Sequence, residues 1–296
     1  GDLGFIVGPR VNAAGRLDDM SIGIECLLAE SSASARGFAE KLHQLNRERR
    51  DIEQSMQQDA LAQLESIDLE GDDSLFAMTL YDSAWHQGVI GILASRIRER
   101  VHRPTLVFAD AEEGMLKGSG RSIAGLHLRD VLDQVATRHP GLLTKFGGHA
   151  MAAGLSLKKD DLDHFKQALN DAVADALGHT PPERSEESDG TLAPGDFGLL
   201  LAEQLASGGP WGQHFPEPLF DGHFSVRSHR IVGEKHLKLT LDADGTEIEG
   251  IAFNIDVPEW QAAPLKTFHA LYRLDVNEYR GERRAQLVIQ SFWPCE

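Results

Sequence analysis

Apolar positions in the first third of the chain follow the period of a long helix. From Ser32 to Ile67 they recur at three-, four- and seven-residue spacings, and no proline interrupts them. Such a helix would be about 50 Å long, and its single apolar stripe indicates a strut between domains. A shorter apolar pattern over 18–30 predicts a small helix before it, whereas the glycine-bounded segment Gly8–Leu17 predicts a loop.

Residues 71–178 alternate between short apolar runs and amphipathic stretches. This alternation is typical of an α/β region, in which helices cover a sheet. The expected strands are 74–80, 105–109, 115–121 and 150–157. The expected helices are 88–101, 126–138 and 162–177.

The last hundred residues have the period of strands. The expected strands are 220–231, 236–242, 246–253, 267–277 and 284–292. A short helix is expected at 197–206, before them, and another at 257–262, between the third and fourth strands. Five strands with a helix in that place resemble an OB-fold barrel, a fold that often binds single-stranded nucleic acid.

A polar, proline-bearing stretch at 179–194 separates these regions and is predicted to be a linker. We therefore expect five segments along the chain. They are 1–31, the long helix at 32–70, the α/β domain at 71–178, the linker at 179–194 and the barrel domain at 195–296.

The charge balance argues against a protein that coats duplexes without sequence preference. The net charge is −17, of the opposite sign to such a coat, although a local basic groove is compatible with it. Cys26 and Cys295 fit no disulfide or metal pattern, which favours a cytoplasmic location. No apolar run reaches the roughly 20 residues of a membrane span, so no membrane contact is expected. The chain starts at Gly1 without an initiator methionine, which predicts part of a longer protein.

Two adjacent glycines and a histidine, Gly147-Gly148-His149, open a run of small residues that ends at Gly154. Glycines let the backbone approach a ligand closely, and a row of amide N–H groups forms an anion site. The same run is also typical of a tight turn followed by a close-packed strand. The pattern alone leaves both interpretations open.

Polar groups that suit phosphate also follow two predicted strands, at Trp85–Gly88 and Ser119–Ser122. Ligands of α/β sheets collect at strand ends, and arginine binds phosphate with two parallel hydrogen bonds. Singly, each group has a structural explanation as a turn residue, a surface ion pair or a helix cap. A metal site is a further alternative. It is less favoured, because neither a carboxylate nor a short ligand spacing accompanies the histidines. That site would consist of His86, His127 and His149.

Basic residues cluster on the long helix as well. The cluster consists of Arg47, Arg49 and Arg50. It could contact a phosphate backbone, but a solvated face with internal ion pairs is the favoured interpretation. The acidic partners would be Glu48, Asp51 and Glu53.

The barrel region carries cations and aromatic residues that could together bind a single strand. The cations are Arg227, His229, Arg230, Lys235 and Lys238. The aromatic residues are Phe253, Tyr272, Tyr279 and Trp293. Alternatively, the aromatic residues fill the barrel, which is the favoured interpretation for Phe253. Residues 191–296 hold nine Lys and Arg against fifteen Asp and Glu, so binding would have to use one face.

The polar motifs and the barrel together resemble a known family. Gly8–Leu17, Ser119–Ser122 and Gly147–Gly154 occur in this order, with the long helix between the first two and Asn277–Glu282 near the end. The whole chain resembles the C-terminal part of the RecJ family, in the DHH phosphoesterase superfamily. The resemblance implies a DHH-associated α/β domain with a mixed sheet and flanking helices, a long connecting helix and an all-β OB-fold barrel. Residues 1–31 would be the end of the N-terminal DHH catalytic lobe.

The resemblance implies a single-strand-specific 5′→3′ DNA exonuclease of DNA repair and recombination. Aspartates and an Asp-His-His motif in the N-terminal lobe would hold two metal ions, Mn²⁺ or Mg²⁺, which activate water for phosphodiester hydrolysis. No Asp-His-His occurs in this sequence, and neither Asp18-Asp19 nor Asp160-Asp161 has a histidine pair beside it. We therefore expect no metal ligand in this chain, and we expect the chain alone to be inactive.

The same resemblance gives roles to the polar motifs. The nucleotide would be reached by Arg10, Asn12 and Arg16. A phosphate near the 5′ end would be gripped by Ser119, Arg121 and Ser122. The scissile or terminal phosphate would be bound by Gly147, Gly148 and His149. His149 is the candidate catalytic residue, and Gly120 replaces an alanine that is expected in many relatives.

The barrel would guide the incoming single strand by stacking and local charge, through Arg227, Arg230, Lys235 and Lys238. A narrow passage would exclude duplex. Single-stranded DNA is thus the expected partner, a single-strand binding protein and a helicase are further expected partners, and the chain is expected to be a monomer.

Two other functions stay open. A small-substrate phosphodiesterase of the same superfamily, acting on nano-RNA or cyclic dinucleotides, would share the Gly-Gly-His motif, but it needs no strand-guiding barrel. A non-catalytic scaffold of the same fold would have no need of a phosphate site, so the intact Arg121 and His149 count against it.

Overall fold

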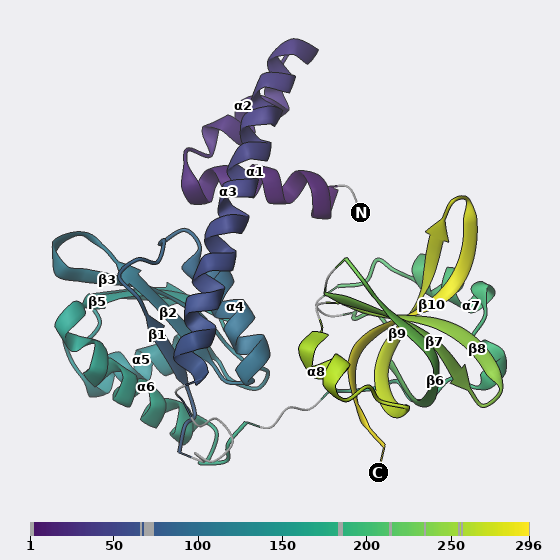
Figure 1. The fold of residues 1–296 in the computed structure, drawn as a ribbon. Coiled ribbons are helices and arrows are strands. Elements are labelled where there is room, and N and C mark those ends of the chain that lie inside the picture. The colour runs from purple at the N-terminus through teal and green to yellow at the C-terminus, as the bar shows by residue number, and fades with distance from the viewer. Residues whose placement is uncertain are drawn as a thin grey trace. The chain divides into compact units, whose positions relative to one another are not determined.

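The computed structural model describes residues 3–65, 67, 74–182, 186–212, 215–233, 235–253, 255 and 257–295. The chain divides into two compact units, Gly1–Arg184 and Ser185–Glu296 (Figure 1). The first unit holds helices and an open sheet, and the second holds a closed barrel. The predicted fold class, an α/β region and an all-β barrel with a long helix, is therefore confirmed. No helix in these ranges is long and apolar enough to cross a membrane.

Three helices open the first unit. They are α1 (Gly8–Leu17), α2 (Ser21–Leu28) and α3 (Ser32–Glu65), preceded by a π-helical segment, η1 (Leu3–Val7). The prediction of a loop over Gly8–Leu17 is wrong. Pro9 lies in the first turn of α1, where its missing N–H leaves no hydrogen bond unmade. Ala13 and Ala14 are fully buried against α2 and α3, and this packing overrides the low helix propensity of the glycines.

Helix α3 takes part in two cores. Near its start, Leu42 and Leu45 pack with buried residues of α1 and α2. Near its end, Met56 and Ala60 pack with the sheet and with α4 (Ile90–Val101). Its 34 residues extend for about 50 Å, so the predicted long helix is confirmed, although it ends at 65 and not at 67.

A five-stranded sheet follows α3. Its strands, in spatial order, are β1 (Met78–Tyr81), β2 (Thr105–Asp110), β3 (Met115–Arg121), β5 (Ala152–Lys158) and β4 (Lys145–Gly148). The first two strands are parallel and the other neighbours are antiparallel, so the sheet is mixed, as predicted. Two short turns are η2 (Glu112–Gly114), before β3, and η3 (Lys159–Asp161), after β5.

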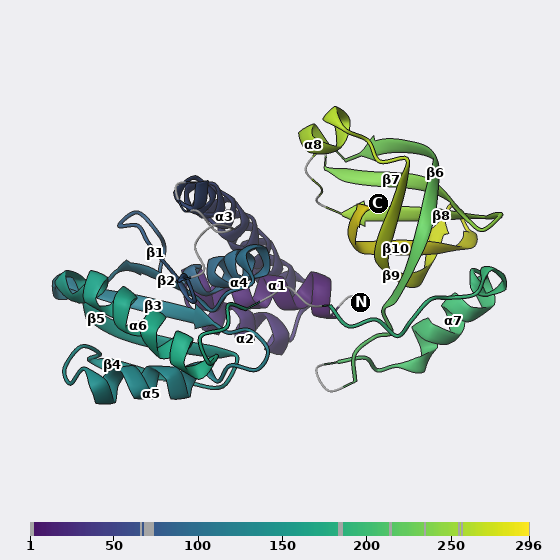
Figure 2. The same ribbon diagram turned by 90° about the horizontal axis from the view of Figure 1, so that it is seen from below.

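Helices cover the two faces of this sheet unequally (Figures 1 and 2). Two further helices are α5 (Leu128–Arg138) and α6 (Leu162–Ala176). They pack on one face, against side chains such as Leu106 and Leu155. α4 and the end of α3 pack on the other face, against Val107 and Ala109 of β2. On this second face the outward residues of β5 and β4 are partly or fully exposed, so half of it is open.

Two strand predictions in this unit need correction. The predicted strand 74–80 begins only at Met78. The N–H groups of Phe76 and Ala77 instead donate to the side-chain oxygen of Asn170, at 2.8 and 3.2 Å. The sequence pattern does not predict β4, because a short segment with two glycines carries little strand propensity. Pairing with β5 nevertheless holds it in the sheet.

The second unit is a five-stranded barrel. Its strands are β6 (Phe220–Val232), β7 (His236–Ala243), β8 (Thr246–Phe253), β9 (Thr267–Tyr279) and β10 (Glu282–Pro294). They close in the order β10-β8-β7-β6-β9, with only β10 and β8 parallel. The helices are α7 (Leu199–Gly208), after the turn η4 (Pro194–Asp196), and α8 (Val257–Ala262). All five predicted strands and the helix between the third and fourth are therefore confirmed.

The end of the predicted linker is bonded to the barrel. The N–H of Asp189 donates to the carbonyl oxygen of Leu219 at 2.7 Å, and the N–H of Asp221 donates to that of Gly190 at 3.2 Å. Residues 183–185 of the same stretch lie outside the described residues. The sequence pattern is polar here because this segment runs along the outside of the barrel.

The barrel aromatic residues divide between the two interpretations that the sequence leaves open. Tyr272 is fully buried in the barrel core. Phe253 is 51% exposed, so the expectation that it fills the barrel is wrong. Side chains alternate along β8, and Ile248, Gly250 and Ala252 take the inward positions. Phe253 therefore points outward.

Candidate phosphate-binding site

Arg121, at the end of β3, is held by backbone and hydroxyl oxygens. Its Nε donates to Oγ of Ser95 at 3.1 Å, and its Nη1 donates to Oγ of Ser119 at 3.2 Å and to the carbonyl oxygen of Gly120 at 2.8 Å. The side chain is half-buried, and within the described residues it makes no ion pair with a carboxylate. A guanidinium that is fixed in this way presents its remaining N–H groups to an anion.

Two further arginines lie near this guanidinium. Burial lowers the pKa of Arg121 below its ordinary value, and the charges of Arg16 and Arg98 lower it further. Arg16, on α1, is fixed by a 3.1 Å hydrogen bond from its Nη1 to the carbonyl oxygen of Gly88. The mutual repulsion of three cations favours an anion among them.

Gly91 allows α4 to approach this cluster. An ideal Cβ at this position would lie 2.9 Å from Oγ of Ser119 and 3.0 Å from Nη2 of Arg121. Gly91 lies in the first turn of α4, and the N-terminus of a helix attracts anions. The Arg121 guanidinium and the N-terminus of α4 therefore attract an anion to the same position.

Sheet pairing brings the two phosphate-type motifs to one edge. Arg121 of β3 pairs with Ala152 of β5, and the N–H of His149 donates to the carbonyl oxygen of Ala152 at 2.8 Å. His149 is exposed. Because neighbouring strands are about 4.8 Å apart, the backbones of Arg121 and His149 are separated by about 10 Å.

Gly148 has a conformation that only glycine adopts readily. Its φ is 145°, and an ideal Cβ would lie 2.4 Å from the carbonyl oxygen of Ala152. At Gly147 a Cβ would meet nothing within 4 Å. The two glycines thus serve different ends: Gly148 permits the close approach of β4 and β5, whereas Gly147 leaves the space above the sheet open.

Ser122 lies apart from this cluster. It is fully buried, its hydroxyl donates to the carbonyl oxygen of Leu126 at 2.8 Å, and its N–H donates to that of Met151 at 3.0 Å. These bonds fix the turn that joins β3 to α5. The structure therefore brings Ser119 and Arg121 together at the surface, but not Ser122.

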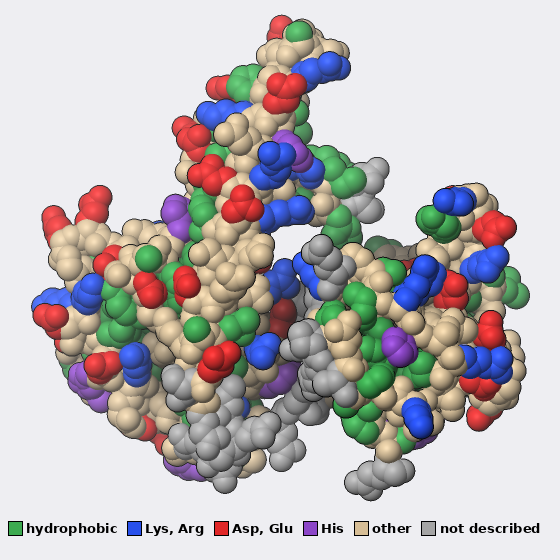
Figure 3. All heavy atoms as spheres, viewed as in Figure 1, with side chains coloured by type: hydrophobic (Ala, Val, Ile, Leu, Met, Phe, Trp, Pro, Cys, Tyr) green, Lys and Arg blue, Asp and Glu red, His purple; other side chains and the backbone are tan. Residues whose placement is uncertain are grey.

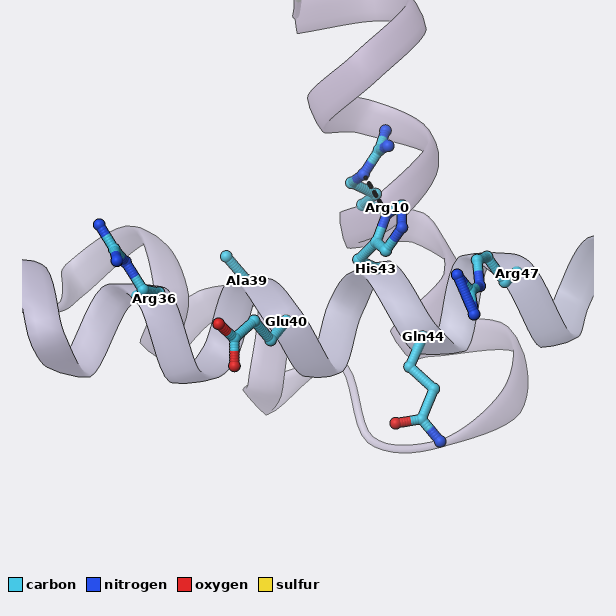
Figure 4. Close-up of a pocket in the computed structure, with 7 residues that line it drawn as sticks. All are labelled: Arg10, Arg36, Ala39, Glu40, His43, Gln44 and Arg47. Atoms are coloured by element: carbon cyan, nitrogen blue, oxygen red, sulfur yellow. Dashed lines mark hydrogen bonds between the residues drawn. The ribbon is translucent and has the colours of Figure 1, made fainter.

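The first motif is divided between two places. Arg16 joins the Arg121 cluster, whereas Arg10 faces α3, where its Nε donates to Nδ1 of His43 at 3.2 Å. A basic hollow of about 490 Å³ lies there (Figure 4). It is lined by Arg10, Arg36, Ala39, Glu40, His43, Gln44 and Arg47. Lys and Arg side chains gather at this junction of α1 and α3 in Figure 3. Asn12 is exposed on α1.

The cluster on the long helix is also divided. Arg49 pairs with Glu53 at 2.5 Å, as expected, but both side chains are only 13% exposed, so the expectation of a solvated face is wrong for this pair. Arg47 lines the hollow beside Arg10 instead, and it makes no ion pair with any residue that the structure describes. Position 47 lies four residues after His43, so one face of α3 collects these side chains.

The histidines of the alternative metal site have separate roles. Nδ1 of His86 accepts from the N–H of Gly88 at 3.0 Å, and Nδ1 of His127 accepts from the N–H of Asp130 at 3.3 Å. Among the described residues, no three His, Cys, Asp or Glu side chains lie close enough to hold a metal ion. The residues present therefore do not fit the two-metal centre that the resemblance implies.

The cations of the barrel differ in whether a carboxylate pairs with them. Arg227 pairs with Asp242 and Glu247, and Lys238 pairs with Glu249 at 3.0 Å. Arg230 and Lys235 are exposed and have no ion pair within the described part of the chain. The aromatic residues with an outward side are Phe253 at 51% exposed, Tyr279 at 65% and Trp293 at 43%.

Several residues of these sites were not among the sequence-based candidates. Ser95 and Gly91 form the wall beside Arg121, and Arg98 adds charge to it. Gly91 and Ser95 are four residues apart on α4, so a small-residue face on a predicted helix was the available signal. His43 and Arg36 carried no comparable signal, because their role depends on the crossing of α1 and α3.

Two family models match this chain. Residues 72–175 match the DHHA1 domain, which here comprises the sheet and helices α4 to α6. Residues 188–291 match the RecJ OB domain, which here comprises the barrel. The two models together leave α1, α2 and α3 unmatched.

Among known proteins, the single-stranded-DNA-specific exonucleases RecJ are similar to the chain over nearly its whole length. That of Dickeya dadantii is 52% identical over 99% of this chain and 51% of the relative, and that of Escherichia coli is 48% identical with the same coverage. The crystal structure of RecJ in complex with Mg²⁺ from Thermus thermophilus matches with a TM-score of 0.79, at 28% identity, over 100% of this chain and 44% of that one. The chain thus spans about half the length of the relatives it matches. With its DHHA1 and RecJ OB domains, it belongs to the RecJ family and corresponds to the C-terminal portion of its members.

Proposed function

We propose that this chain supplies the phosphate- and strand-binding half of a single-strand-specific 5′→3′ DNA exonuclease. The observation that carries the proposal is the Arg121 guanidinium. It is fixed by Ser95 and Ser119, it lies near Arg16 and Arg98, and no carboxylate pairs with Arg121 itself in the described residues. Within the described residues, no carboxylate neutralises this arginine. It is oriented for an anion that comes from outside the protein.

The 5′ phosphate of a single strand suits this site in charge and geometry. Arg121 would bind two phosphate oxygens, and Ser119 would complete the shell. His149, one strand further along the same edge, would contact the scissile phosphate as the candidate catalytic residue. Arg10, with Arg36 and Arg47 in the hollow of α3, would bind the backbone of the same strand.

The barrel would contribute strand contacts outside this unit. Arg230 and Lys235 provide free charge, and Phe253 provides an exposed ring for base stacking. Arg227 and Lys238, the other two candidates, would contribute less because they are already paired. A single-strand binding protein and a helicase as partners, a monomeric state and a cytoplasmic location remain predictions.

Hydrolysis would need the metal ions of the parent protein, Mn²⁺ or Mg²⁺, which supply an activated water. We propose that the chain alone binds DNA without turnover, since no described group of residues offers three metal donors. Incubation of the chain with a 5′-labelled oligonucleotide and Mn²⁺ tests this. Degradation that is lost in His149→Ala would contradict it.

Fluorescence anisotropy tests the binding proposal. We expect the chain to prefer 5′-phosphorylated single-stranded DNA over the unphosphorylated strand and over duplex, and we expect Arg121→Ala to lose the preference. Lys166→Ala, which removes a paired cation on α6, serves as the matched control. Equal binding of all three ligands, or an unchanged preference in Arg121→Ala, would reject the proposed site.

A further inference from the structure

The open half of the sheet face carries a second row of polar side chains. The strand register pairs Lys117 of β3 with Ser156 of β5, and Ser156 with Lys145 of β4. Paired residues of neighbouring strands lie on the same face, so these three residues form one line, here called the lysine row. With about 4.8 Å between strands, the backbones of the two lysines are about 10 Å apart.

The lysine row lies on the same face as Arg121. Gly118 and Gly120 face Phe108 and Leu128 in the core on the α5 side. Positions 117, 119 and 121 of β3 therefore point to the opposite, open face. Lys117 is four residues from Arg121 along the strand, which corresponds to about 13 Å. A single phosphate cannot contact both.

The two lysines differ from other lysines of this unit in their partners. Lys159 pairs with Asp110, and Lys166 pairs with Asp163. Lys117 and Lys145 are both exposed, and neither has a carboxylate partner among the residues that the structure describes. Two like charges on one row, with the Ser156 hydroxyl between them, favour a bound anion.

A hollow of about 310 Å³ lies over this row. It is lined by Lys117, Gly118, Lys145, Phe146, Gly147, Gly154, Leu155 and Ser156. Gly147 and Gly154 pair with each other between the lysine row and the Arg121 edge. A Cβ at Gly147 would meet nothing within 4 Å, and one at Gly154 would meet only a carbonyl oxygen at 3.8 Å. The floor of the hollow therefore consists of backbone that no side chain covers. The volume of the hollow is in the range of ligand sites.

We propose that the lysine row is a second phosphate site. It binds an internal phosphate of the single strand whose terminal phosphate is held by Arg121, beyond the scissile phosphate, and the intervening part of the strand lies over Gly147 and Gly154. Lysine suits an internal phosphate, because its ammonium is a point charge on a flexible stem and needs no fixed orientation, whereas the terminal phosphate takes the arginine fork. The inference rests on the proposed function and extends the DNA path along β3.

Calorimetric titration of the chain with 5′-phosphorylated thymidine ligands tests this inference. The ligands are a mononucleotide, a dinucleotide and a tetranucleotide, titrated at low salt into the wild type, Arg121→Ala and the double variant Lys117→Ala with Lys145→Ala. The matched control is Lys41→Ala with Lys166→Ala, which removes the same charge from α3 and α6. None of the four lysines is buried, so each variant should fold, and a thermal melt verifies this.

We expect the double variant to bind the tetranucleotide about tenfold more weakly than the wild type and the control. Its affinity for the mononucleotide should be unchanged, because one phosphate reaches only Arg121. The salt dependence of tetranucleotide binding should fall by about 0.7 in log–log slope, as for one lost phosphate contact with a single strand.

The outcomes separate this inference from the proposed function. If the double variant binds the tetranucleotide as the wild type does, or loses the mononucleotide equally, the lysine row is not a second site. The proposed function survives that result as long as Arg121→Ala weakens the mononucleotide. If Arg121→Ala changes nothing, or if no ligand binds to the wild type, both the inference and the proposed function are rejected.

Discussion

The cations on the open face of the sheet and several arginines of the barrel differ in what surrounds them. In the barrel, Arg227, Arg273 and Arg283 each lie against at least one carboxylate. On the open face of the sheet, Arg121 and Lys117 have no such partner in the described part of the chain. A paired cation must give up its carboxylate before it gains a phosphate, whereas an unpaired one gains the whole interaction.

This difference shows why net charge is a poor guide to which cations of the chain can bind an anion. The chain carries −17 overall, yet the position of each carboxylate decides which cations are available. Screening at physiological salt confines surface charge effects to about 8 Å. Acidic residues of the sheet unit that lie further than this from Arg121 therefore have little influence on an anion beside it.

The largest expected effect concerns the backbone that shapes the sheet face. Gly148→Ala forces a side chain into a φ of 145° and places Cβ 2.4 Å from the carbonyl oxygen of Ala152. We expect a loss of about 3 kcal/mol in the free energy of unfolding, measured by urea denaturation. Gly147→Ala, with open space around it, should change the free energy by less than about 1 kcal/mol. Equal losses would show that the glycine pair does not have the two roles described.

A smaller effect separates the arginines of the two units. Arg121→Lys keeps the charge but loses the fork that Ser95 and Ser119 hold in place. We expect roughly tenfold weaker binding of a 5′-phosphorylated strand, measured by anisotropy. Arg227→Lys in the barrel should bind like the wild type, because its guanidinium is engaged by Asp242. If the two variants behaved alike, ion pairing would not explain the difference between the units.

Within the barrel, the free and the paired cations should also differ. Arg230→Ala is expected to weaken single-strand binding a few-fold, because Arg230 is exposed and has no ion pair in the described barrel residues. Lys238→Ala should have no measurable effect, since Glu249 already neutralises Lys238. Filter binding at low salt can measure both. A larger loss in Lys238→Ala would show that its ion pair with Glu249 does not keep Lys238 from binding the strand.

The smallest expected effect is on acid stability. Hydrogen bonds from Ser188 and then from His269 hold the pKa of Asp221 below its usual value of 3.8. A lowered pKa stabilises the folded state above the usual value, and the contribution disappears as the pH falls through the lowered one. Asp221→Asn should therefore cost less than about 1 kcal/mol at pH 7, and the difference should shrink as the pH falls below 3.8. A difference that persists in acid would point to packing instead of charge.

The sequence predicted most elements, because their apolar periods were long and clear. The exception at α1 is instructive: the glycines and Pro9 are typical of a turn, and only the burial of Ala13 against α3 makes the segment helical. Ser119 and Arg121 were predicted as neighbours because they share a strand. Ser95 and Lys145 could not be predicted, since their places depend on how α4 and β4 pack across the sheet.

Helix α3 sets the distance between two basic sites of the first unit, the hollow at Arg10 and the guanidinium of Arg121. Its first half belongs to the core of α1 and α2, and its second half belongs to the core of α4 and the sheet. Glu53 links α3 to α4, because its carboxylate forms ion pairs with Arg49 of the same helix at 2.5 Å and with Arg96 of α4 at 3.4 Å. The basic hollow at Arg10 thus lies at the first half of α3, and the sheet that carries Arg121 packs against its second half. For a DNA strand that contacts both sites, the protein fixes the distance between them. The number of nucleotides in between is then set by the protein and not by the flexibility of the DNA.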